Sequence, residues 1–234
     1  MTKIKLKHYK ILMSKVNTGI IIKYLKTHRE ELRDYLNIIV VNSNFSYKTF
    51  GAAIEEHLSQ VLIKLLSKDG FIKNRNDYML APHKNYFPDF TLNSNPKLAI
   101  EYKSGNISQF RDGKWINVKN SENDMGTLNE WQKKIDKFGG NNIYYIFVVY
   151  NFNDKTQEIV DIQIDPFYKF IGLNSFRVLK YREKDGNLRP KNFSEKSPIS
   201  DLKHFTLLLG KTNIYRSRRI ILKHKRIIKD TKLD

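Results

Sequence analysis

Two short stretches decide the fold of this chain: Phe87-Pro88-Asp89-Phe90-Thr91-Leu92 and Ala99-Ile100-Glu101-Tyr102-Lys103. Between them stands Asn93-Ser94-Asn95-Pro96, whose residues are typical of a turn. Two apolar, alternating runs on either side of such a turn predict a β-hairpin. Asp89 and Glu101 are 101 − 89 = 12 positions apart. A hairpin would therefore let them face each other at one edge of a sheet.

The second strand of this hairpin has two chemically different faces. Lys103 follows Glu101 by two residues, so strand periodicity places both side chains on the same face. The other face would carry Leu98, Ile100 and Tyr102. Together with Asp89, three ionisable groups are thus expected at one point, backed by an apolar layer.

Two carboxylates and an ammonium are the set that phosphodiester hydrolysis needs. Carboxylate oxygens suit Mg²⁺ rather than zinc, and water and a phosphate oxygen would complete the coordination. Such a cation polarises the phosphate and helps a bound water lose its proton. Asp89 and Glu101 are the expected principal ligands, the Tyr102 backbone carbonyl a further one, and Lys103 would assist the attacking water.

A third carboxylate precedes the hairpin, on a helix predicted over residues 47–68. Glu55 falls on the same helical stripe as Ala52, Leu58, Leu62 and Leu65. A carboxylate on a core-facing stripe costs free energy unless something pairs with it. A metal ion or Lys103 would do so, and Glu55 joins the expected catalytic and metal-binding residues.

The remaining pattern alternates helices and strands, which favours an α/β domain with a mixed central sheet flanked by helices. Helices are expected over 18–36, 126–138 (with Thr127 as N-cap) and 215–229, where the isoleucines would pack on the core. Strands are expected over 143–150, 158–164 and 202–209, with a small ribbon near Trp115.

Composition adds a broad expectation about partners. The 234 residues include 42 Lys and Arg against 24 Asp and Glu, a formal net charge of +18. Such a surface attracts polyanions, although the Lys-, Asn- and Ile-rich composition of an A/T-rich genome would produce part of that excess. The chain has no cysteine and shows no apolar stretch long enough for a signal peptide or a membrane span. We therefore expect a reducing cytoplasm and no membrane partner.

At Pro88-Asp89 and Glu101-Tyr102-Lys103 the sequence resembles the PD-(D/E)xK nuclease superfamily. Within it, Gly70-Phe71-Ile72 and the hairpin resemble the blunt-cutting type II restriction endonucleases of the EcoRV and HincII kind, and Glu55 falls on their helix glutamate. Residues 125–127, 143–150 and 215–218 are similar to relatives such as SwaI. One departure is Glu101, where EcoRV-type sites have aspartate; the superfamily accepts both.

The resemblance implies a restriction-endonuclease-like core and a single endonuclease domain over residues 1–234. Its catalytic core would span about 47–165 and a DNA-recognition region about 177–234. It also implies a homodimer that grips double-stranded DNA and cuts both strands of a palindromic site, leaving blunt ends. Mg²⁺ would be the cofactor, with Mn²⁺ substituting. A DNA methyltransferase would belong to the same system without being a stable subunit, in the cytoplasm of a bacterium or archaeon.

Polar and basic residues around these motifs are candidate DNA contacts. They are His83, Lys84, Asn85, Ser104, Asn106, Lys119, Asn123, Gly126, Thr127, Asn192, Ser194, Lys196, Ser197, Ser200, Lys203, Lys211, Thr212, Asn213, Arg216 and Arg218. For most of them an ordinary solvated loop or a helix cap is the competing interpretation. The sequence leaves open whether the 191–203 excursion or the stretch 210–213 reads bases.

Two other functions fit the same residues. A structure-specific repair or junction nuclease of the same superfamily would cut branched DNA without sequence preference. A catalytically inactive DNA-binding module would bind without cutting, although the intact Asp89, Glu101 and Lys103 set argues against decay.

Overall fold

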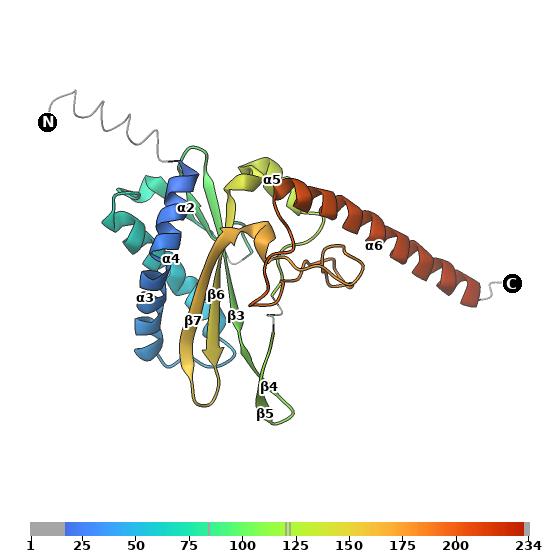
Figure 1. The fold of residues 1–234 in the computed structure, drawn as a ribbon, viewed down its shortest axis with the longest axis horizontal. Coiled ribbons are helices and arrows are strands. Elements are labelled where there is room, and N and C mark those ends of the chain that lie inside the picture. The colour runs from blue at the N-terminus through green and yellow to red at the C-terminus, as the bar shows by residue number, and fades with distance from the viewer. Residues whose placement is uncertain (1–16, 84, 120, 122, 232–234) are drawn as a thin grey trace.

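A computed structural model describes residues 17–83, 85–119, 121 and 123–231 of this chain. Its centre is a mixed five-stranded sheet in the order β1-β2-β3-β6-β7 (Figure 1). The strands are β1 (Tyr78–Leu80), β2 (Phe90–Leu92), β3 (Leu98–Asn106), β6 (Ile143–Phe152) and β7 (Gln157–Pro166). Only β3 and β6 run parallel; every other neighbouring pair is antiparallel. The expected α/β architecture with a mixed sheet is confirmed.

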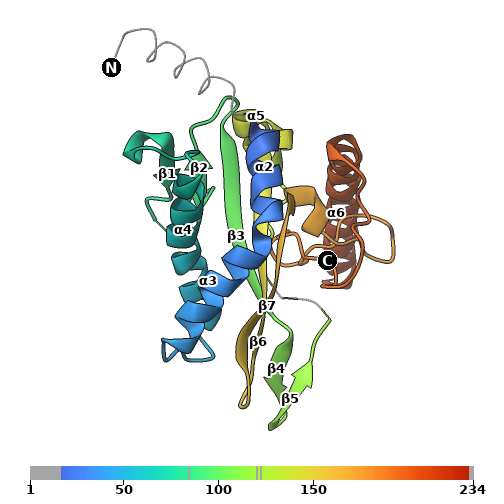
Figure 2. The same ribbon diagram turned by 60° about the vertical axis from the view of Figure 1, so that its left-hand side comes forward.

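The predicted hairpin is the β2–β3 pair, joined through the turn at residues 93–97. The apolar run expected to form a buried central strand is β6, which lies between β3 and β7. The ribbon expected near Trp115 is a separate pair of strands, β4 (Ser108–Arg111) and β5 (Lys114–Asn117), which extends from the end of β3 (Figure 2).

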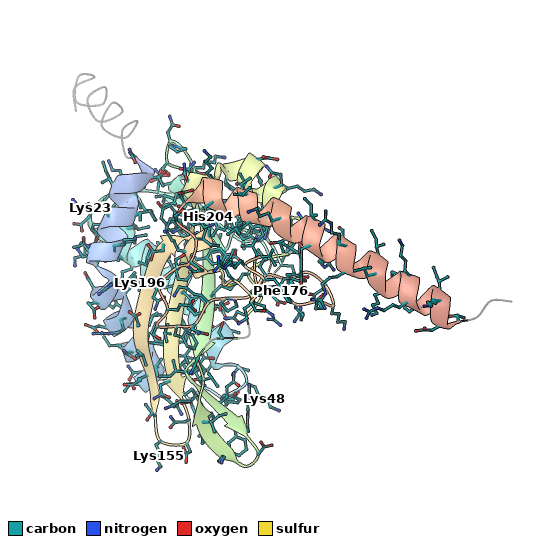
Figure 3. All side chains as sticks on the ribbon, turned by 45° about the vertical axis from the view of Figure 1, so that its right-hand side comes forward. Lys23, Lys48, Lys155, Phe176, Lys196 and His204 are labelled. Carbon is teal, nitrogen blue, oxygen red and sulfur yellow. The ribbon has the colours of Figure 1, made fainter. Side chains whose placement is uncertain are left out.

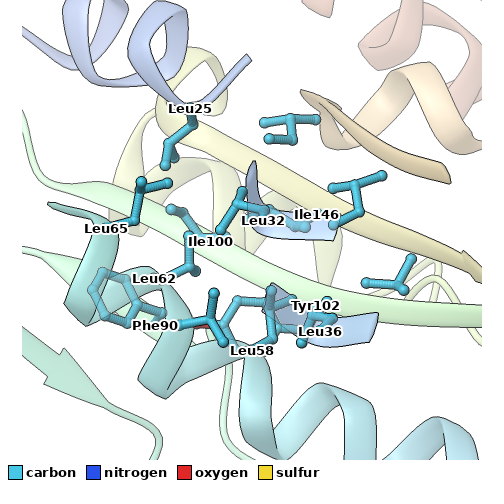
Figure 4. Packing of buried hydrophobic residues seen from close by; sticks show 14 of the residues in the cluster. Leu25, Leu32, Leu36, Leu58, Leu62, Leu65, Phe90, Ile100, Tyr102 and Ile146 are labelled. Atoms are coloured by element: carbon cyan, nitrogen blue, oxygen red, sulfur yellow. The ribbon is translucent and has the colours of Figure 1, made fainter. Parts of the chain in front are cut away.

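Three helices cover one face of the sheet: α2 (Thr18–Thr27), α3 (Arg29–Val41) and α4 (Phe50–Lys68). Their buried leucines pack against Phe90, Ile100 and Tyr102 from the hairpin (Figure 4). Asn37 fixes α3 to β7, because its side-chain amide both donates to and accepts from the backbone of Ile159.

The single helix predicted over 18–36 is wrong, because the chain forms two helices that meet at His28. The His28 backbone N–H donates to the Tyr24 carbonyl, and its ring Nδ1 lies 2.9 Å from the same oxygen. The chain therefore turns without a glycine or proline, the residues that usually mark a helix end in a sequence.

The opposite face of the sheet is covered by α5 (Trp131–Phe138), the 3₁₀ turn η3 (Phe167–Phe170), the segment 171–201 and the start of α6. Trp131 is fully buried there and stacks on Phe167 at 4.0 Å between ring centroids. The helix expected from Gly126 begins only at Trp131, and Thr127 is not its N-cap. Thr127 instead forms an antiparallel bridge with Asn187.

The last element, α6, is one helix of 29 residues (Leu202–Asp230), about 43 Å long. The strand expected over 202–209 is therefore wrong. Asp201 caps the helix by accepting from the His204 N–H at 2.8 Å, and the buried Phe205, Leu208, Leu209 and Thr212 follow a helical repeat.

The outer half of α6 extends away from the sheet (Figure 1). Its isoleucines are exposed, up to 67% for Ile228, so the expectation that they pack on the core is also wrong. Among the described residues, no helix is both long enough and apolar enough to cross a membrane.

Candidate active site

The candidate site lies where β2 ends beside β3. The described β2–β3 ladder stops at the pair Phe90–Ile100, which places Asp89 opposite Glu101 in register. The next backbone N–H on this side of β3, that of Tyr102, donates to Asp89 Oδ2 at 2.6 Å. A carboxylate thus takes the position of the next backbone acceptor. Because the N–H and C=O of one strand residue point to the same side, the Tyr102 carbonyl faces this edge as well.

Glu101 and Lys103 stand side by side on one face of β3, as strand periodicity predicts. Lys103 Nζ lies 2.9 Å from Glu101 Oε1, and the two side chains are 18% and 13% exposed. Tyr102 points to the opposite face, where it is buried and its hydroxyl accepts from Ser59 Oγ at 3.2 Å. The apolar layer behind the charges anchors the strand that carries them.

Glu55 reaches the site from α4. Its Oε1 accepts a hydrogen bond of 2.8 Å from Ser104 Oγ, one residue beyond Lys103. The helix approaches β3 closely here, because a Cβ on Gly51 would stand 2.8 Å from Ser104 Oγ. Ala52, which shares the predicted stripe with Glu55, is exposed at the start of the helix.

Burial and like charges change the proton affinities of these groups. Burial, followed by the negative charge of Glu101, raises the pKa of Asp89 to about 7. Burial also raises the pKa of Glu55, against the opposing effects of Lys103 and Ser104. For Lys103, burial alone would lower the pKa, but the carboxylates of Glu101, Glu55 and Asp89 outweigh it and the net pKa is raised. The lysine is therefore a stable cation among acids.

The residues present fit a divalent cation with oxygen ligands. Glu101 Oε2 is buried and, within the described part of the chain, has no hydrogen-bond partner. Such an orphaned carboxylate oxygen beside a second buried carboxylate is costly without a cation. Among the described residues, no three His, Cys, Asp or Glu side chains are grouped closely enough to hold an ion by themselves. Mg²⁺ typically takes one or two carboxylates and completes its shell with water and substrate phosphate oxygens.

Three of the expected DNA-contacting residues lie around the end of β3. Ser104 is buried against Glu55, and its carbonyl accepts from the Asn123 side-chain amide. Asn106 uses both ends of its side chain on the backbone of Phe152. A cavity of about 250 Å³ opens beside them, lined also by Tyr47 and Lys48. Asn106 and Asn123 thus have structural partners, which accounts for them without DNA.

Other candidates lie near the hairpin. His83 and Asn85 are exposed in the segment between β1 and β2 that leads to Asp89, and Lys84 lies outside the described residues. Lys119 is exposed, and its carbonyl accepts from the Phe193 N–H at 2.8 Å. Gly126 is in the left-handed region (φ 86°), packed against Trp131 and Lys134 rather than at a helix N-terminus.

The two segments proposed to read bases, 191–203 and 210–213, have different structures. Residues 210–213 are no loop, because Lys211, Thr212 and Asn213 lie within α6. Thr212 is fully buried and bonds to the backbone of Leu208 and Leu179, which accounts for it without DNA. Arg216 lies against Gly186 and Arg218 is exposed on the same helix.

The 191–203 excursion is irregular up to residue 201. Its exposed members are Ser194, Lys196, Ser200 and Lys203, with Asn192 and Ser197 half-buried. Ser197 and Ser200 bond locally, to Ile199 and to Asp201. Lys196 of this segment lies away from Lys48, which lines the cavity at the end of β3 (Figure 3). A DNA-contacting role for this segment stays a prediction.

Sequence reasoning missed one charged residue near the acids, Lys134 on α5. Its ammonium lies 4.2 Å from the ring centroid of Phe87 and 5.1 Å from that of Trp131. Burial lowers the pKa of Lys134, while the charges of Glu101 and Asp89 act in the opposite direction. The only signal in the sequence is the helix pattern that begins near Trp131, and it does not show what the helix packs against.

The chain is similar to known proteins in its fold rather than in its sequence. No protein-family profile matches its sequence, and no curated protein matches it. Among solved structures, it is similar to the NlaIV restriction endonuclease, with a TM-score of 0.54 over 74% of this chain and 67% of that chain. The fold is restriction-endonuclease-like. At 14% sequence identity the similarity concerns the fold alone, so the narrower resemblance to EcoRV, HincII and SwaI stays a prediction.

The four ionisable side chains of the candidate site come from neighbouring elements. Asp89 comes from the end of one strand, Glu101 and Lys103 from the next, and Glu55 from the helix behind them. These side chains come together at the edge where β2 ends.

Proposed function

We propose that this chain is a Mg²⁺-dependent nuclease that hydrolyses phosphodiester bonds of DNA. The observation that carries the proposal is the meeting of Asp89, Glu101 and Lys103 at the end of the β2–β3 ladder. The restriction-endonuclease-like fold supports it, as does the formal charge of +18.

Asp89 and Glu101 would hold the cation, with the Tyr102 carbonyl at the same edge. When bound, Mg²⁺ would supply Lewis-acid stabilisation of the phosphate and a more acidic water. The Tyr102 N–H holds the Asp89 carboxylate in place, and Glu101 holds the Lys103 ammonium. Lys103 then offers a fixed positive charge to the phosphate and the attacking water. The water oxygen bonds to phosphorus, the ester P–O bond breaks, and a proton passes to the leaving oxygen.

Glu55 has a supporting position in this arrangement. Ser104 holds its carboxylate, and its negative charge helps to keep Lys103 protonated. Glu55 therefore contributes to the acidic site even though Asp89 and Glu101 are the ligands that we favour.

The narrower function that we propose is that of a type II restriction endonuclease. A homodimer would cut both strands of a short palindromic site, with blunt ends, with Mn²⁺ able to replace Mg²⁺, and a methyltransferase would protect the host site. The support for these details is the resemblance of residues 70–72, 86–92 and 99–103 to the EcoRV-type stretch.

The test is digestion of unmethylated plasmid DNA with Mg²⁺ or Mn²⁺, followed by sequencing of the fragment ends. We expect cuts at one short sequence, their loss in Asp89→Asn, and their retention in Asp154→Asn, a control on an exposed turn. Binding without any cleavage by the unaltered protein would refute the nuclease. Cleavage of branched DNA without sequence preference would indicate a junction nuclease instead of a restriction endonuclease.

A further inference from the structure

A lysine-lined pocket lies beside the candidate active site, between α5 and the segment that leads into β2. It has a volume of about 260 Å³ and is lined by Lys133, Lys134 and Lys137, together with Asn85 and Phe87 of the segment that leads into β2. We call it the α5 lysine pocket. Nothing in the sequence motif or in the proposed metal site uses it.

The three lysines of this pocket are gathered against electrostatic cost. Lys133 and Lys137 are four residues apart and Lys134 and Lys137 three, spacings at which like charges on a helix repel. Glu130 is the acidic residue lining the pocket. Within the described part of the chain, none of the three lysines forms an ion pair or a hydrogen bond. Three positive charges thus line the pocket against one negative charge.

Aromatic rings, rather than carboxylates, hold two of these ammonium groups. Lys134 Nζ stands over Phe87 and Trp131, and Lys137 Nζ lies 5.4 Å from the ring centroid of Tyr86. A ring face attracts a cation but leaves its charge unneutralised. Lys134 is moreover half-buried, so it has lost part of its hydration. Both conditions favour an incoming anion.

The position of the pocket suggests which anion. Phe87 lines it and precedes Asp89 by two residues, a span of at most about 7 Å of extended chain. A DNA strand carries a phosphate for every ~3.4 Å along the helix axis. A strand whose scissile phosphate lay at Asp89 and Glu101 would therefore bring its next phosphates to the α5 lysines.

We propose that the α5 lysine pocket binds a backbone phosphate of the DNA next to the scissile one, with Lys134 as the central contact. The inference rests on the proposed function for its geometry, but it is a statement about binding. It also explains why Lys134 stays unpaired although Glu101 and Asp89 influence its charge: its partner belongs to the substrate.

The test compares Lys134→Met with Lys23→Met, a control that removes the same charge from the exposed face of α2 (Figure 3). Affinity for a short DNA duplex is measured over a range of salt concentrations, in Ca²⁺ or EDTA so that nothing is cut. Losing one phosphate contact should lower the slope of log affinity against log salt by roughly 0.9 relative to the control. Equal slopes for the two variants would overturn the proposal.

Two further measurements separate the alternatives. Methionine keeps the length and apolar character that pack on Phe87 and Trp131, so Lys134→Met should unfold at the temperature of the unaltered protein; if it does not, Lys134→Gln takes its place in the comparison. Inorganic phosphate, tested by thermal shift, should stabilise the unaltered protein more than Lys134→Met. Stabilisation by phosphate with an unchanged DNA slope would assign the pocket to free phosphate and overturn the DNA site.

The outcomes also distinguish this inference from the proposed function. If the protein cuts no DNA but Lys134→Met shows the smaller slope, the phosphate site stands and the proposed nuclease activity is refuted. If the protein cuts DNA and both variants show equal slopes, the proposed nuclease activity stands and the phosphate site is refuted.

Discussion

The carboxylate of Asp89 accepts the backbone N–H of Tyr102 at 2.6 Å, where the backbone ladder between β2 and β3 has just ended. One side chain therefore has two roles. It satisfies a strand N–H that would otherwise be unpaired, and it presents its other oxygen to the site. The two roles are separable by substitution.

Asp89→Asn should keep the stability of the fold and lose the chemistry, whereas Asp89→Ala should lose the chemistry and part of the stability. The asparagine carbonyl still accepts from Tyr102, but it brings no charge to a cation. Alanine leaves the N–H unpaired, at a cost of about 1–3 kcal/mol. Cleavage should fall by more than about 100-fold in both variants, since the loss of a group that only supports a metal ligand already costs about 10–100-fold. Urea unfolding and plasmid cleavage measure the two effects; equal stability of the two variants would contradict the structural role.

Without divalent ions, stability should fall as the pH rises from about 4 to about 7. The folded protein holds a proton on Asp89, with its pKa of about 7, over a range where the unfolded chain, with its pKa of 3.8, has released it. Since the folded state binds more protons in this window, its free energy of unfolding decreases with pH, by at most about 1.4 kcal/mol per unit from this group.

Asp89→Asn serves as the control for this pH effect, because it removes the titrating group and keeps an acceptor for the Tyr102 N–H. As the pH rises from 5 to 7 in EDTA, the melting temperature of the unaltered protein should fall relative to that of Asp89→Asn. Added Mg²⁺ should stabilise the unaltered protein most at the upper end. A constant difference at every pH would show that Asp89 titrates normally.

Two helical glycines should respond in opposite ways to alanine. A Cβ on Gly210, in α6, would meet nothing within 4 Å, so Gly210→Ala should stabilise the protein by about 0.5–1 kcal/mol. A Cβ on Gly51 would displace Ser104, which lies 2.8 Å away and holds Glu55. Gly51→Ala should gain no stability and should reduce cleavage. Unfolding and cleavage assays on both variants check this, and a stabilised, fully active Gly51→Ala would exclude the close approach.

Thr212→Val should destabilise the protein by about 1–3 kcal/mol without changing its affinity for DNA. The buried Thr212 hydroxyl donates to the Leu208 carbonyl and accepts from the Leu179 N–H at 3.0 Å, which valine would leave unpaired. Thr206 is the matched control, since its exposed hydroxyl makes the same bond to the carbonyl four residues back and no other. Comparable losses in both variants would contradict the special role of Thr212.

Removal of residues 220–234 should leave the melting temperature nearly unchanged and weaken DNA binding. The described residues of this stretch are exposed, so little apolar burial is lost. The stretch carries five Lys or Arg. Each that touches a phosphate contributes roughly 0.9 to the salt slope. A large fall in melting temperature would show instead that the isoleucines of α6 are covered in solution.

The sequence predicts well wherever the pattern is local. The alternation around Asp89 and Glu101 predicts the hairpin and the shared face of Glu101 and Lys103. The apolar run at 143–150 predicts the central strand, and the leucine stripe predicts α4. In each case the spacing of apolar residues within the element itself indicates whether it is a helix or a strand.

It fails where the outcome depends on distant partners. The spacing of Phe205, Leu208 and Leu209 suits a helix, but Gly210 suggests an end there. Packing against the apolar cluster around Trp131 keeps α6 continuous. Asn106 is committed to Phe152, 46 residues away, and Lys134 meets Phe87 only because α5 lies against the hairpin. Neither contact has a local signature.

The early end of β2 has a consequence for the handling of this protein. An unpaired strand edge is a template for another strand and promotes aggregation, and prolines and charges are the usual protection. Here Pro88 offers no N–H, Asp89 accepts the Tyr102 N–H, and Asn123 donates to the Ser104 carbonyl. Glu101 and Lys103 place charge beside these groups. The groups suited to cutting a phosphodiester thus also shield the edge from self-association. Inactive variants made for work with DNA should keep a polar side chain at each of these positions.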